Sequence, residues 1–288
     1  MGRNTAEFAD GWWTAADGVR LHYRDYPGSG AHVPVLCVPG LTRNARDFAA
    51  MAERLAGSRR VIVVELRGRG MSDHARDAMT YQPACYLRDL LGLIDALGLE
   101  RLVVFGTSLG GLLAMLLGAS ARPLLAGVLL NDIGPVLDPA GIARIRSYVG
   151  KGTSWPTWLH AAKAIAETHH AAFPDHAIAD WLAMARRLCR LTPQGRIVQD
   201  YDMKIAEPFR LPPPEPAADL WPALESLAGM PAVLVRGGLS DVLSAATAEE
   251  MARRLPRLDV VTLPRIGHAP MLDEPECIAA IDRLLARV

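Results

Sequence analysis

Short hydrophobic runs along the chain alternate with segments of helical periodicity. The runs are apolar and mostly β-branched, which is typical of strands buried on both faces: residues 35–38, 61–65, 101–105, 127–130, 232–235 and 258–262. An alternating pattern with a turn at Asp17-Gly18 predicts a hairpin over residues 11–26. Apolar side chains at helical spacing predict helices over residues 45–55 and 83–97. This order predicts a mostly parallel sheet with helices on both faces.

The alternation breaks in the middle of the chain. This stretch shows amphipathic helical patterns and no convincing strand: residues 155–170, 177–190 and 194–206. It closes with Leu-Pro-Pro-Pro-Glu-Pro at residues 211–216, which indicates a stiff polyproline connector. We therefore predict a helical cap over residues 136–216, inserted into a core domain of residues 1–135 and 217–288. The alternative is that these helices simply extend the main helical layer.

The composition restricts where the protein works and what it binds. The chain has 31 acidic and 31 basic residues, so it lacks the basic excess of a nucleic-acid-binding protein. No stretch approaches the ~18 consecutive apolar residues of a membrane span, and the N-terminus, with Glu7 and Asp10, lacks the apolar part of a secretory signal. The cysteines are widely scattered, which indicates free thiols in a reducing compartment: Cys37, Cys85, Cys189 and Cys277. We expect a cytoplasmic monomer or homodimer with no nucleic-acid or membrane partner.

Three neighbouring histidines raise the question of a metal site. His169, His170 and His176 belong to a segment that is typical of a solvated helix end before Phe173-Pro174. No cysteine or carboxylate spacing supports metal ligation there. We expect neither a metal nor any other cofactor.

A serine between glycines follows directly on one of the predicted strands. The strand over residues 101–105 runs into Gly-Thr-Ser-Leu-Gly at residues 106–110, and a helical pattern follows from Leu112. A G-x-S-x-G pattern between strand and helix is typical of a nucleophile elbow, a tight turn that holds the serine in strained backbone angles. The context favours Ser108 as the nucleophile over Ser154, which is followed by Trp-Pro.

A serine hydroxyl needs a general base, and the base needs an orienting acid. Loops after later strands offer both: Asp241 ends an Arg-Gly-Gly-Leu-Ser-Asp loop, and His268 lies in a Gly-His-Ala-Pro segment after the last strand. Catalytic groups gather at the carboxyl ends of strands in open α/β sheets. We therefore expect Ser108, Asp241 and His268 to meet at one edge as nucleophile, acid and base.

Acyl transfer also requires N–H donors for the developing oxyanion. The backbone N–H of Leu109, directly after the nucleophile and at the start of a helix, is the first candidate. The second is the backbone N–H of Leu41, beside Gly40 in the loop after the strand over residues 35–38.

Several segments match motifs of one known family: Val-Pro-Gly-Leu at 38–41, Glu-Leu-Arg-Gly-Arg-Gly-Met-Ser at 65–72, Gly-Thr-Ser-Leu-Gly-Gly at 106–111, Leu-Ser-Asp at 239–241 and Gly-His at 267–268. Over nearly its full length the chain resembles the α/β-hydrolase superfamily, in particular cytoplasmic bacterial carboxylesterase-like members with a helical cap. The resemblance implies the α/β-hydrolase fold, with a mostly parallel eight-stranded sheet flanked by helices and an inserted helical cap. It also implies a triad of Ser108, Asp241 and His268. The chain departs from the family at Pro39, where histidine is common, and at Glu65, where aspartate is commoner.

The orienting acid has a rival. Asp132 follows the strand over residues 127–130, where some members of the superfamily place the acid of the triad. Asp241 is favoured by its spacing to His268 and by its Gly-Gly-x-Ser-Asp loop. Asp132 is also explained as a turn residue that binds the backbone amides of Ile133-Gly134.

Other side chains near these motifs have two interpretations. The tryptophans of the predicted cap either line a substrate pocket or form the core of the cap: Trp155, Trp158 and Trp181. Arg43 and Arg46 flank the oxyanion loop and could hold a substrate carboxylate, but exposed arginines at a helix start are favoured. Arg67 and Arg69 are expected to fix their own loop.

Together these features predict an enzyme, a serine hydrolase that cleaves carboxylic esters of small hydrophobic substrates through an acyl-enzyme. Other reactions of the superfamily use the same triad and stay open: C–C bond hydrolysis, lactone or thioester hydrolysis, and cofactor-free perhydrolysis. A dehalogenase or an epoxide hydrolase would need a carboxylate in place of Ser108. A small-molecule receptor on the same scaffold is the alternative of another class, because a fold does not fix a function.

Overall fold

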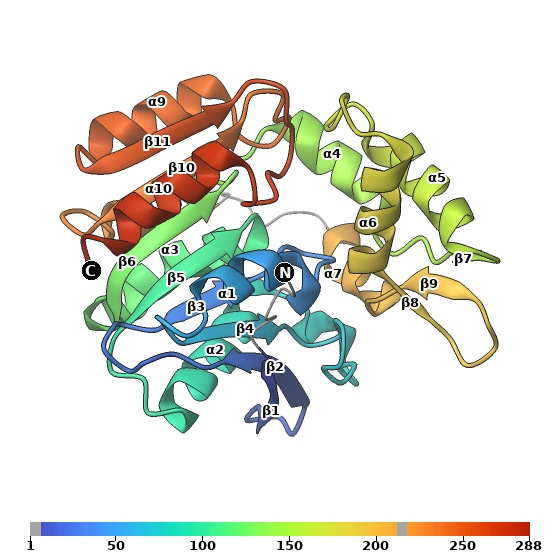
Figure 1. Cartoon of the computed structure of the whole chain (residues 1–288), viewed down its shortest axis with the longest axis horizontal. Coiled ribbons are helices and arrows are strands. Elements are labelled where there is room, and N and C mark those ends of the chain that lie inside the picture. The colour runs from blue at the N-terminus through green and yellow to red at the C-terminus, as the bar shows by residue number, and fades with distance from the viewer. Residues whose placement is uncertain (1–6, 212–217) are drawn as a thin grey trace, which may run out of the picture.

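A mixed sheet forms the centre of the molecule (Figure 1). The structure is a computed structural model in which residues 7–211 and 218–288 are described, so the predicted connector lies outside them except for Leu211. The sheet has eight strands in the order β1-β2-β4-β3-β5-β6-β10-β11. Its antiparallel part is β1 (Ala9–Thr14), β2 (Arg20–Tyr26) and the pairing of β2 with β4 (Val61–Glu65). From β4 onward all pairs are parallel: β3 (Val35–Val38), β5 (Leu102–Thr107), β6 (Leu125–Asn131), β10 (Ala232–Gly237) and β11 (Leu258–Leu263). The predicted mostly parallel eight-stranded sheet is confirmed.

Helices cover both faces of this sheet. One face packs against α1 (Ala49–Leu55) and α10 (Pro275–Leu285). The other packs against α2 (Pro83–Ala96), α3 (Leu109–Ala121), α8 (Trp221–Glu225) and α9 (Ala245–Arg254). Successive strand residues point to opposite sides, so Leu36 and Val38 join one apolar cluster while Val35 and Cys37 join the other. Burial of both faces explains why the central strands β3, β5 and β6 are almost entirely apolar rather than alternating.

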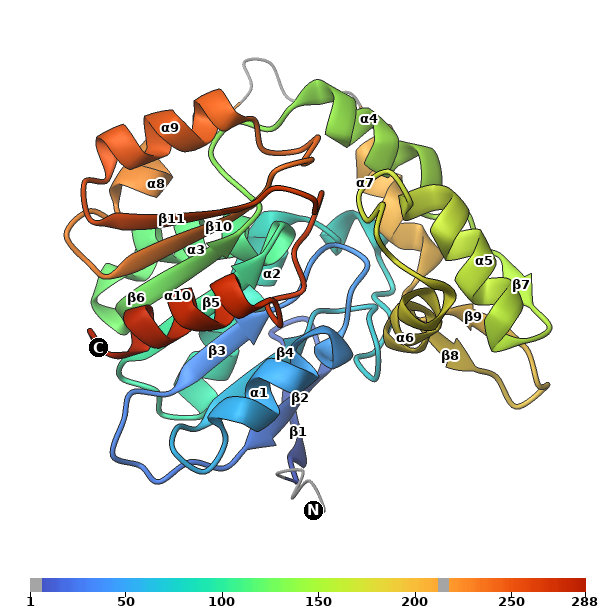
Figure 2. The same ribbon diagram turned by 45° about the horizontal axis from the view of Figure 1, so that its top comes forward.

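The chain from α4 to α7, which lies between β6 and β10 and is called the inserted segment, forms a separate layer to one side of the sheet (Figure 2). Its helices are α4 (Pro139–Tyr148), α5 (Trp158–His169), α6 (Ile178–Leu188) and α7 (Glu207–Arg210). The helical patterns over residues 155–170 and 177–190 correspond to α5 and α6. The boundaries of a cap domain at residues 136–216 stay a prediction.

A small antiparallel sheet in this layer corrects the expectation that it holds no strand. Its order is β7-β9-β8, with bounds β7 (Ser154–Trp155), β8 (Cys189–Leu191) and β9 (Ile197–Gln199). The helix expected over residues 194–206 is therefore wrong for its first part. Gly195, at φ +74°, closes a turn in which the Thr192 N–H donates to the Arg196 carbonyl, so the chain reverses and pairs with itself. Gly195 is the turn signal in this stretch, and it determines the conformation in place of the helical spacing of the apolar residues.

The four cysteines are buried and free: Cys37, Cys85, Cys189 and Cys277. Within the described ranges, no helix is long and apolar enough to cross a membrane. The same ranges contain no cluster of histidine, cysteine and carboxylate side chains arranged to hold a metal ion.

Candidate active site

Ser108 lies on the turn between β5 and α3, with φ +52° and ψ −115°. A non-glycine residue rarely adopts a positive φ, and here neighbouring backbone imposes it. A Cβ atom at Gly106 would lie 2.3 Å from the Gly110 carbonyl oxygen, and one at Gly110 would lie 1.9 Å from the Val38 carbonyl oxygen. The glycines on both sides are therefore required for the close approach of β3, β5 and α3, as a nucleophile elbow demands.

A chain of hydrogen bonds links Ser108 to His268 and His268 to Asp132. The distance from Ser108 Oγ to His268 Nε2 is 2.9 Å, and that from His268 Nδ1 to Asp132 Oδ2 is 2.7 Å. Because a carboxylate oxygen accepts, we assign the imidazole proton to Nδ1, which leaves Nε2 free to accept the serine proton. Asp132 is fully buried and also accepts hydrogen bonds from the Gly237 N–H at 2.8 Å and the Ser240 hydroxyl at 2.6 Å. These contacts fix the carboxylate and thereby the imidazole ring.

The prediction that Asp241 orients His268 is wrong. The Asp241 side chain is 34% exposed and forms a two-point ion pair with Arg144 of α4, at 2.5 and 2.8 Å. The Arg144 guanidinium holds the pKa of the Asp241 carboxyl below its usual value. The loop after β10 instead turns the preceding residue, Ser240, towards the triad, where its hydroxyl supports Asp132. The rival candidate therefore occupies the position of the orienting acid.

The loop after β3 brings Leu41 beside Ser108, and Leu109 follows Ser108 at the start of α3. Both are the predicted oxyanion donors, and that role stays a prediction. Arg69, which is fully buried, donates from Nε to the Leu41 carbonyl at 2.8 Å and from Nη1 to the Arg67 carbonyl at 2.6 Å. Arg69 thus fixes its own loop, as expected, and also the Leu41 residue of a second loop. Arg67 is held by Asp17 and Asp89.

Replacement of Arg69 by methionine is expected to lower kcat by about 10- to 100-fold with a smaller change in KM. The apolar side chain fills similar space but releases the Leu41 carbonyl, so the backbone on the C-terminal side of Leu41 is held less firmly and the neighbouring Leu41 N–H, the predicted oxyanion donor, is less well positioned. Outright loss of such a donor costs ~10²–10³ in kcat. Steady-state kinetics of R69M on a short ester measure the effect. R69K, which keeps the charge and one donor, should recover part of kcat. If R69M and R69K lost the same factor in kcat/KM, and lost it through a higher KM rather than a lower kcat, Arg69 would not have a positioning role.

Glu65, the departure from the family motif, joins the segments that follow β3 and β4. Its carboxylate accepts from the Ala45 N–H at 3.0 Å, the Met71 N–H at 2.7 Å and His22 Nδ1 at 2.9 Å. Burial alone would raise the pKa of this carboxyl, but His22 and the two N–H donors outweigh it and hold the pKa below the ordinary 4.5. The longer side chain of glutamate thus connects residues 45 and 71.

Replacement of Glu65 by glutamine is expected to lower the free energy of unfolding at pH 7 by about 1–3 kcal/mol, because the neutral amide leaves a buried donor poorly paired. A carboxyl with a lowered pKa in the folded state stabilises above its unfolded pKa and ceases to do so as the pH falls through the folded value. Wild type should therefore approach E65Q in stability as the pH is lowered from 7 to below 4.5. Urea unfolding at several pH values measures this difference. A gap between the proteins that did not narrow on acidification would contradict it.

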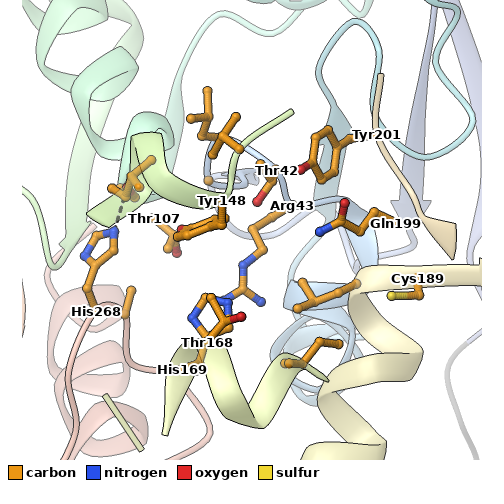
Figure 3. A pocket seen from close by; sticks show the side chains of 18 of the residues that line it. Thr42, Arg43, Thr107, Tyr148, Thr168, His169, Cys189, Gln199, Tyr201 and His268 are labelled. Atoms are coloured by element: carbon orange, nitrogen blue, oxygen red, sulfur yellow. Dashed lines mark hydrogen bonds between the residues drawn. The ribbon is translucent and has the colours of Figure 1, made fainter. Parts of the chain in front are cut away.

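Two cavities meet at Ser108. The first, of about 110 Å³, is the polar chamber, and Figure 3 shows its interior. Beside apolar residues, its lining includes six polar or aromatic ones: Arg43, Tyr148, Thr168, His169, Gln199 and Tyr201. The second, of about 340 Å³, is the apolar chamber. Arg146 also lines it, but most of its lining is apolar, including Leu109, Leu112, Ile133, Leu137, Ile142 and Phe209. Leu41, Ser108 and Ile145 line both.

The cap tryptophans divide between the two interpretations. Trp155 lines the polar chamber. Trp158 and Trp181 line neither chamber in the described part of the chain. Trp181 packs with Phe173 in the apolar core of the inserted segment, and Trp158 lies under the Arg186 guanidinium. The assignment of Trp158 and Trp181 to the substrate pocket is therefore wrong.

Two polar residues of the chamber were misjudged from the sequence. Arg43 was expected to be exposed, but its side chain is 16% exposed and lines the polar chamber. His169 was expected at a solvated helix end, yet it lines the same chamber with its ring against Tyr148. Burial, together with the charges of Arg43 and Arg144, lowers the pKa of His169 to about 3, so its imidazole is neutral at physiological pH. Arg46 instead pairs with Asp200 at 2.7 Å and has a structural role.

Residues 35–280 match the model of the alpha/beta hydrolase family. The chain belongs to the α/β-hydrolase family. Over 269 residues, 90% of each chain, this α/β-hydrolase is 35% identical to a 3-hydroxybutyrate-oligomer hydrolase of Cupriavidus necator. It is 26% identical to a 2-(acetamidomethylene)succinate hydrolase of Mesorhizobium japonicum over 80% of this chain and 79% of that one.

The fold agrees with a solved structure of an α/β hydrolase from Novosphingobium aromaticivorans, with a TM-score of 0.95. That chain is 55% identical to this α/β-hydrolase, and the match covers 98% of this chain and 99% of the other. The relatives are hydrolases of diverse substrates, so the family membership establishes the fold and the general class of activity.

Proposed function

We propose that the protein is a serine hydrolase that cleaves carboxylic esters through an acyl-enzyme. The observation that carries this proposal is the hydrogen-bond chain from Ser108 through His268 to Asp132. Its first member, Ser108, lies on a strained turn between a strand and a helix. Ser108 is the nucleophile, His268 the general base and Asp132 the orienting acid. The chamber walls on both sides of Ser108 offer room for the two parts of an ester.

The geometry gives each group one task. Ser108 Oγ attacks the ester carbonyl while its proton passes to His268 Nε2, and Asp132 stabilises the imidazolium that forms. The N–H groups of Leu41 and Leu109 bind the oxyanion of the tetrahedral intermediate. The intermediate collapses, the C–O bond breaks, and the proton on Nε2 passes to the leaving alcohol. Water, activated by the neutral His268, then hydrolyses the acyl-enzyme and releases the acid.

The names of the relatives support hydrolysis of an acyl bond. The Cupriavidus necator protein is named for hydrolysis of 3-hydroxybutyrate oligomers, and the Mesorhizobium japonicum protein for hydrolysis of an acetamido compound. The larger, apolar chamber favours an ester whose acyl part is hydrophobic.

A panel of substrates that differ in the bond to be cleaved tests the proposal. Three carry the same butyryl group, as an alkyl ester, a thioester and an amide; a lactone and a substrate for C–C bond hydrolysis complete the panel. We expect multiple turnovers on the ester, with a burst of alcohol release where deacylation is slow, and none with S108A. Labelling of Ser108 without release of the acid would indicate a receptor instead. Faster cleavage of the amide, thioester, lactone or C–C bond than of the ester would contradict ester hydrolysis as the main activity.

A further inference from the structure

The two chambers are lined by different residues of the proposed catalytic machinery. Among the described residues that line them, Ser108 and Leu41 belong to both, His268 to the polar chamber and Leu109 to the apolar chamber. In ester cleavage the protonated base must hand its proton to the leaving oxygen, which therefore lies on the side of the base. His268 lies at one end of the polar chamber in Figure 3. The polar chamber thus receives the leaving alcohol, and the apolar chamber receives the acyl group.

The polar chamber carries an incompletely neutralised positive charge. Within residues 7–211 and 218–288, the carboxylate that pairs with Arg43 is that of Asp47, and the Nη1 to Oδ1 distance of 3.4 Å is long for a hydrogen bond. Figure 3 shows the Arg43 side chain reaching into the chamber between Tyr148 and Thr168. A sheltered guanidinium held by a carboxylate at a single long contact favours an additional anionic ligand, since a buried charge is costly unless it is well paired.

The neighbouring Arg144 and His169 are less suited than Arg43 to bind an anionic ligand. Arg144 is already bound at two points by Asp241, at 2.5 and 2.8 Å. His169 is neutral because of its burial and the nearby arginines, so it contributes a hydrogen-bonding ring rather than a charge. Among the described residues that line this chamber, the incompletely paired cationic group is therefore the Arg43 guanidinium, which lies near neutral donors and acceptors.

We propose, on the basis of the proposed ester hydrolysis, that the natural substrate is an ester of a short hydroxy acid, whose leaving alcohol carries a carboxylate that Arg43 binds in the polar chamber. Arg43 matches a carboxylate with two parallel N–H donors, a geometry that lysine cannot reproduce. The volume of about 110 Å³ suits a hydroxy acid of few carbons. The acyl–oxygen bond breaks, the His268 proton passes to the freed oxygen, and the hydroxy acid leaves with its carboxylate unchanged.

Three esters with a four-carbon acyl or alkyl group test whether a carboxylate is recognised, and on which side of the ester bond. The first is the butyrate ester of 3-hydroxypropanoate, the second its neutral carboxamide, and the third the butyl monoester of succinate, which places the carboxylate on the acyl side. Wild type should cleave the first with a kcat/KM about 10- to 100-fold above the second, the range expected for hydrogen bonds to a charged group. The third should be a poorer substrate than the first, because its carboxylate would lie among the mostly apolar lining of the second chamber rather than beside Arg43.

Variants of Arg43 test which side chain supplies the preference. R43Q should lose the preference for the carboxylate ester, chiefly because the KM for that ester rises, while kcat/KM for the carboxamide ester changes little. R43K should show an intermediate preference. R253Q removes the same charge from the surface of α9, where the arginine side chain is 71% exposed, and should leave both rates as they are. Competitive inhibition by free 3-hydroxypropanoate gives a readout without turnover, and R43Q should weaken it.

Several results would overturn the inference while ester hydrolysis stands. These are equal rates on the carboxylate and carboxamide esters, an equal loss on both in R43Q, or an Arg43-dependent preference for the succinate ester. Absence of turnover on every ester in the wild type would instead remove the proposed function itself.

Discussion

Replacement of Asp132 by asparagine is expected to lower kcat by about 10⁴-fold, as for the corresponding acid of other serine triads. An asparagine amide that donates to His268 Nδ1 would leave the ring proton on Nε2, so the imidazole could no longer accept the proton of Ser108. The side chain is fully buried and accepts from Gly237 and Ser240, so part of the effect will also come from a looser ring. Steady-state kinetics on a short ester, with circular dichroism to confirm folding, measure the loss.

Asp241 provides the matched control for this experiment. It follows a strand of the same sheet and carries the same chemical group, but its partner is Arg144 rather than His268. D241N should therefore affect kcat far less than D132N, with any effect on stability small because the ion pair is partly exposed. A greater loss of kcat in D241N than in D132N would show that the triad acid is not Asp132.

Replacement of Ser108 by alanine is expected to remove ester turnover, by about 10⁶-fold in kcat, because no other hydroxyl is bonded to His268 Nε2 among the described residues. Alanine fits the elbow, so the thermal unfolding of S108A should resemble that of the wild type. Residual activity is measured on protein from a host without background esterase.

The partner variant H268A should lose activity on a similar scale, and the S108A/H268A double variant should be little worse than either. Nucleophile and base act as one unit, so their losses do not add. A double variant with a loss close to the product of the two single losses would show that the two residues act independently.

The elements of the sheet could be predicted because burial on both faces leaves a strong signal in the sequence. Runs such as Val35–Val38 are apolar throughout, and their spacing with helices allows few arrangements. Ser108 was also predictable, since the glycines around it answer a steric demand that the structure shows directly. Where a local stretch of chain determines the conformation, the sequence was sufficient.

The identity of the acid depends on side-chain direction, which the sequence does not encode locally. Asp132 and Asp241 both follow strands, and the difference arises because Arg144, from the inserted segment, binds Asp241 while Ser240 turns inward. The Gly-Gly-x-Ser-Asp loop lies beside Asp132, but its serine rather than its aspartate makes the contact.

The chamber residues were missed for a related reason. Tyr148 and His169 end helices α4 and α5, and Arg43 precedes a short 3₁₀ turn (Ala45–Phe48), so each appears in sequence as a polar residue at an element terminus. Such positions are usually solvated. Here packing of the inserted segment against the sheet edge converts them into cavity walls.

The triad and five of the polar residues that line the polar chamber come from different parts of the chain. Ser108, Asp132 and His268 follow strands β5, β6 and β11, whereas Tyr148, Thr168, His169, Gln199 and Tyr201 lie within the insertion between β6 and β10. Mutations in residues 139–201 can therefore alter which molecules are accepted while the bond-breaking apparatus stays intact. An enzyme built in this way can acquire new substrates over evolutionary time through one contiguous stretch of sequence, without passing through an inactive ancestor.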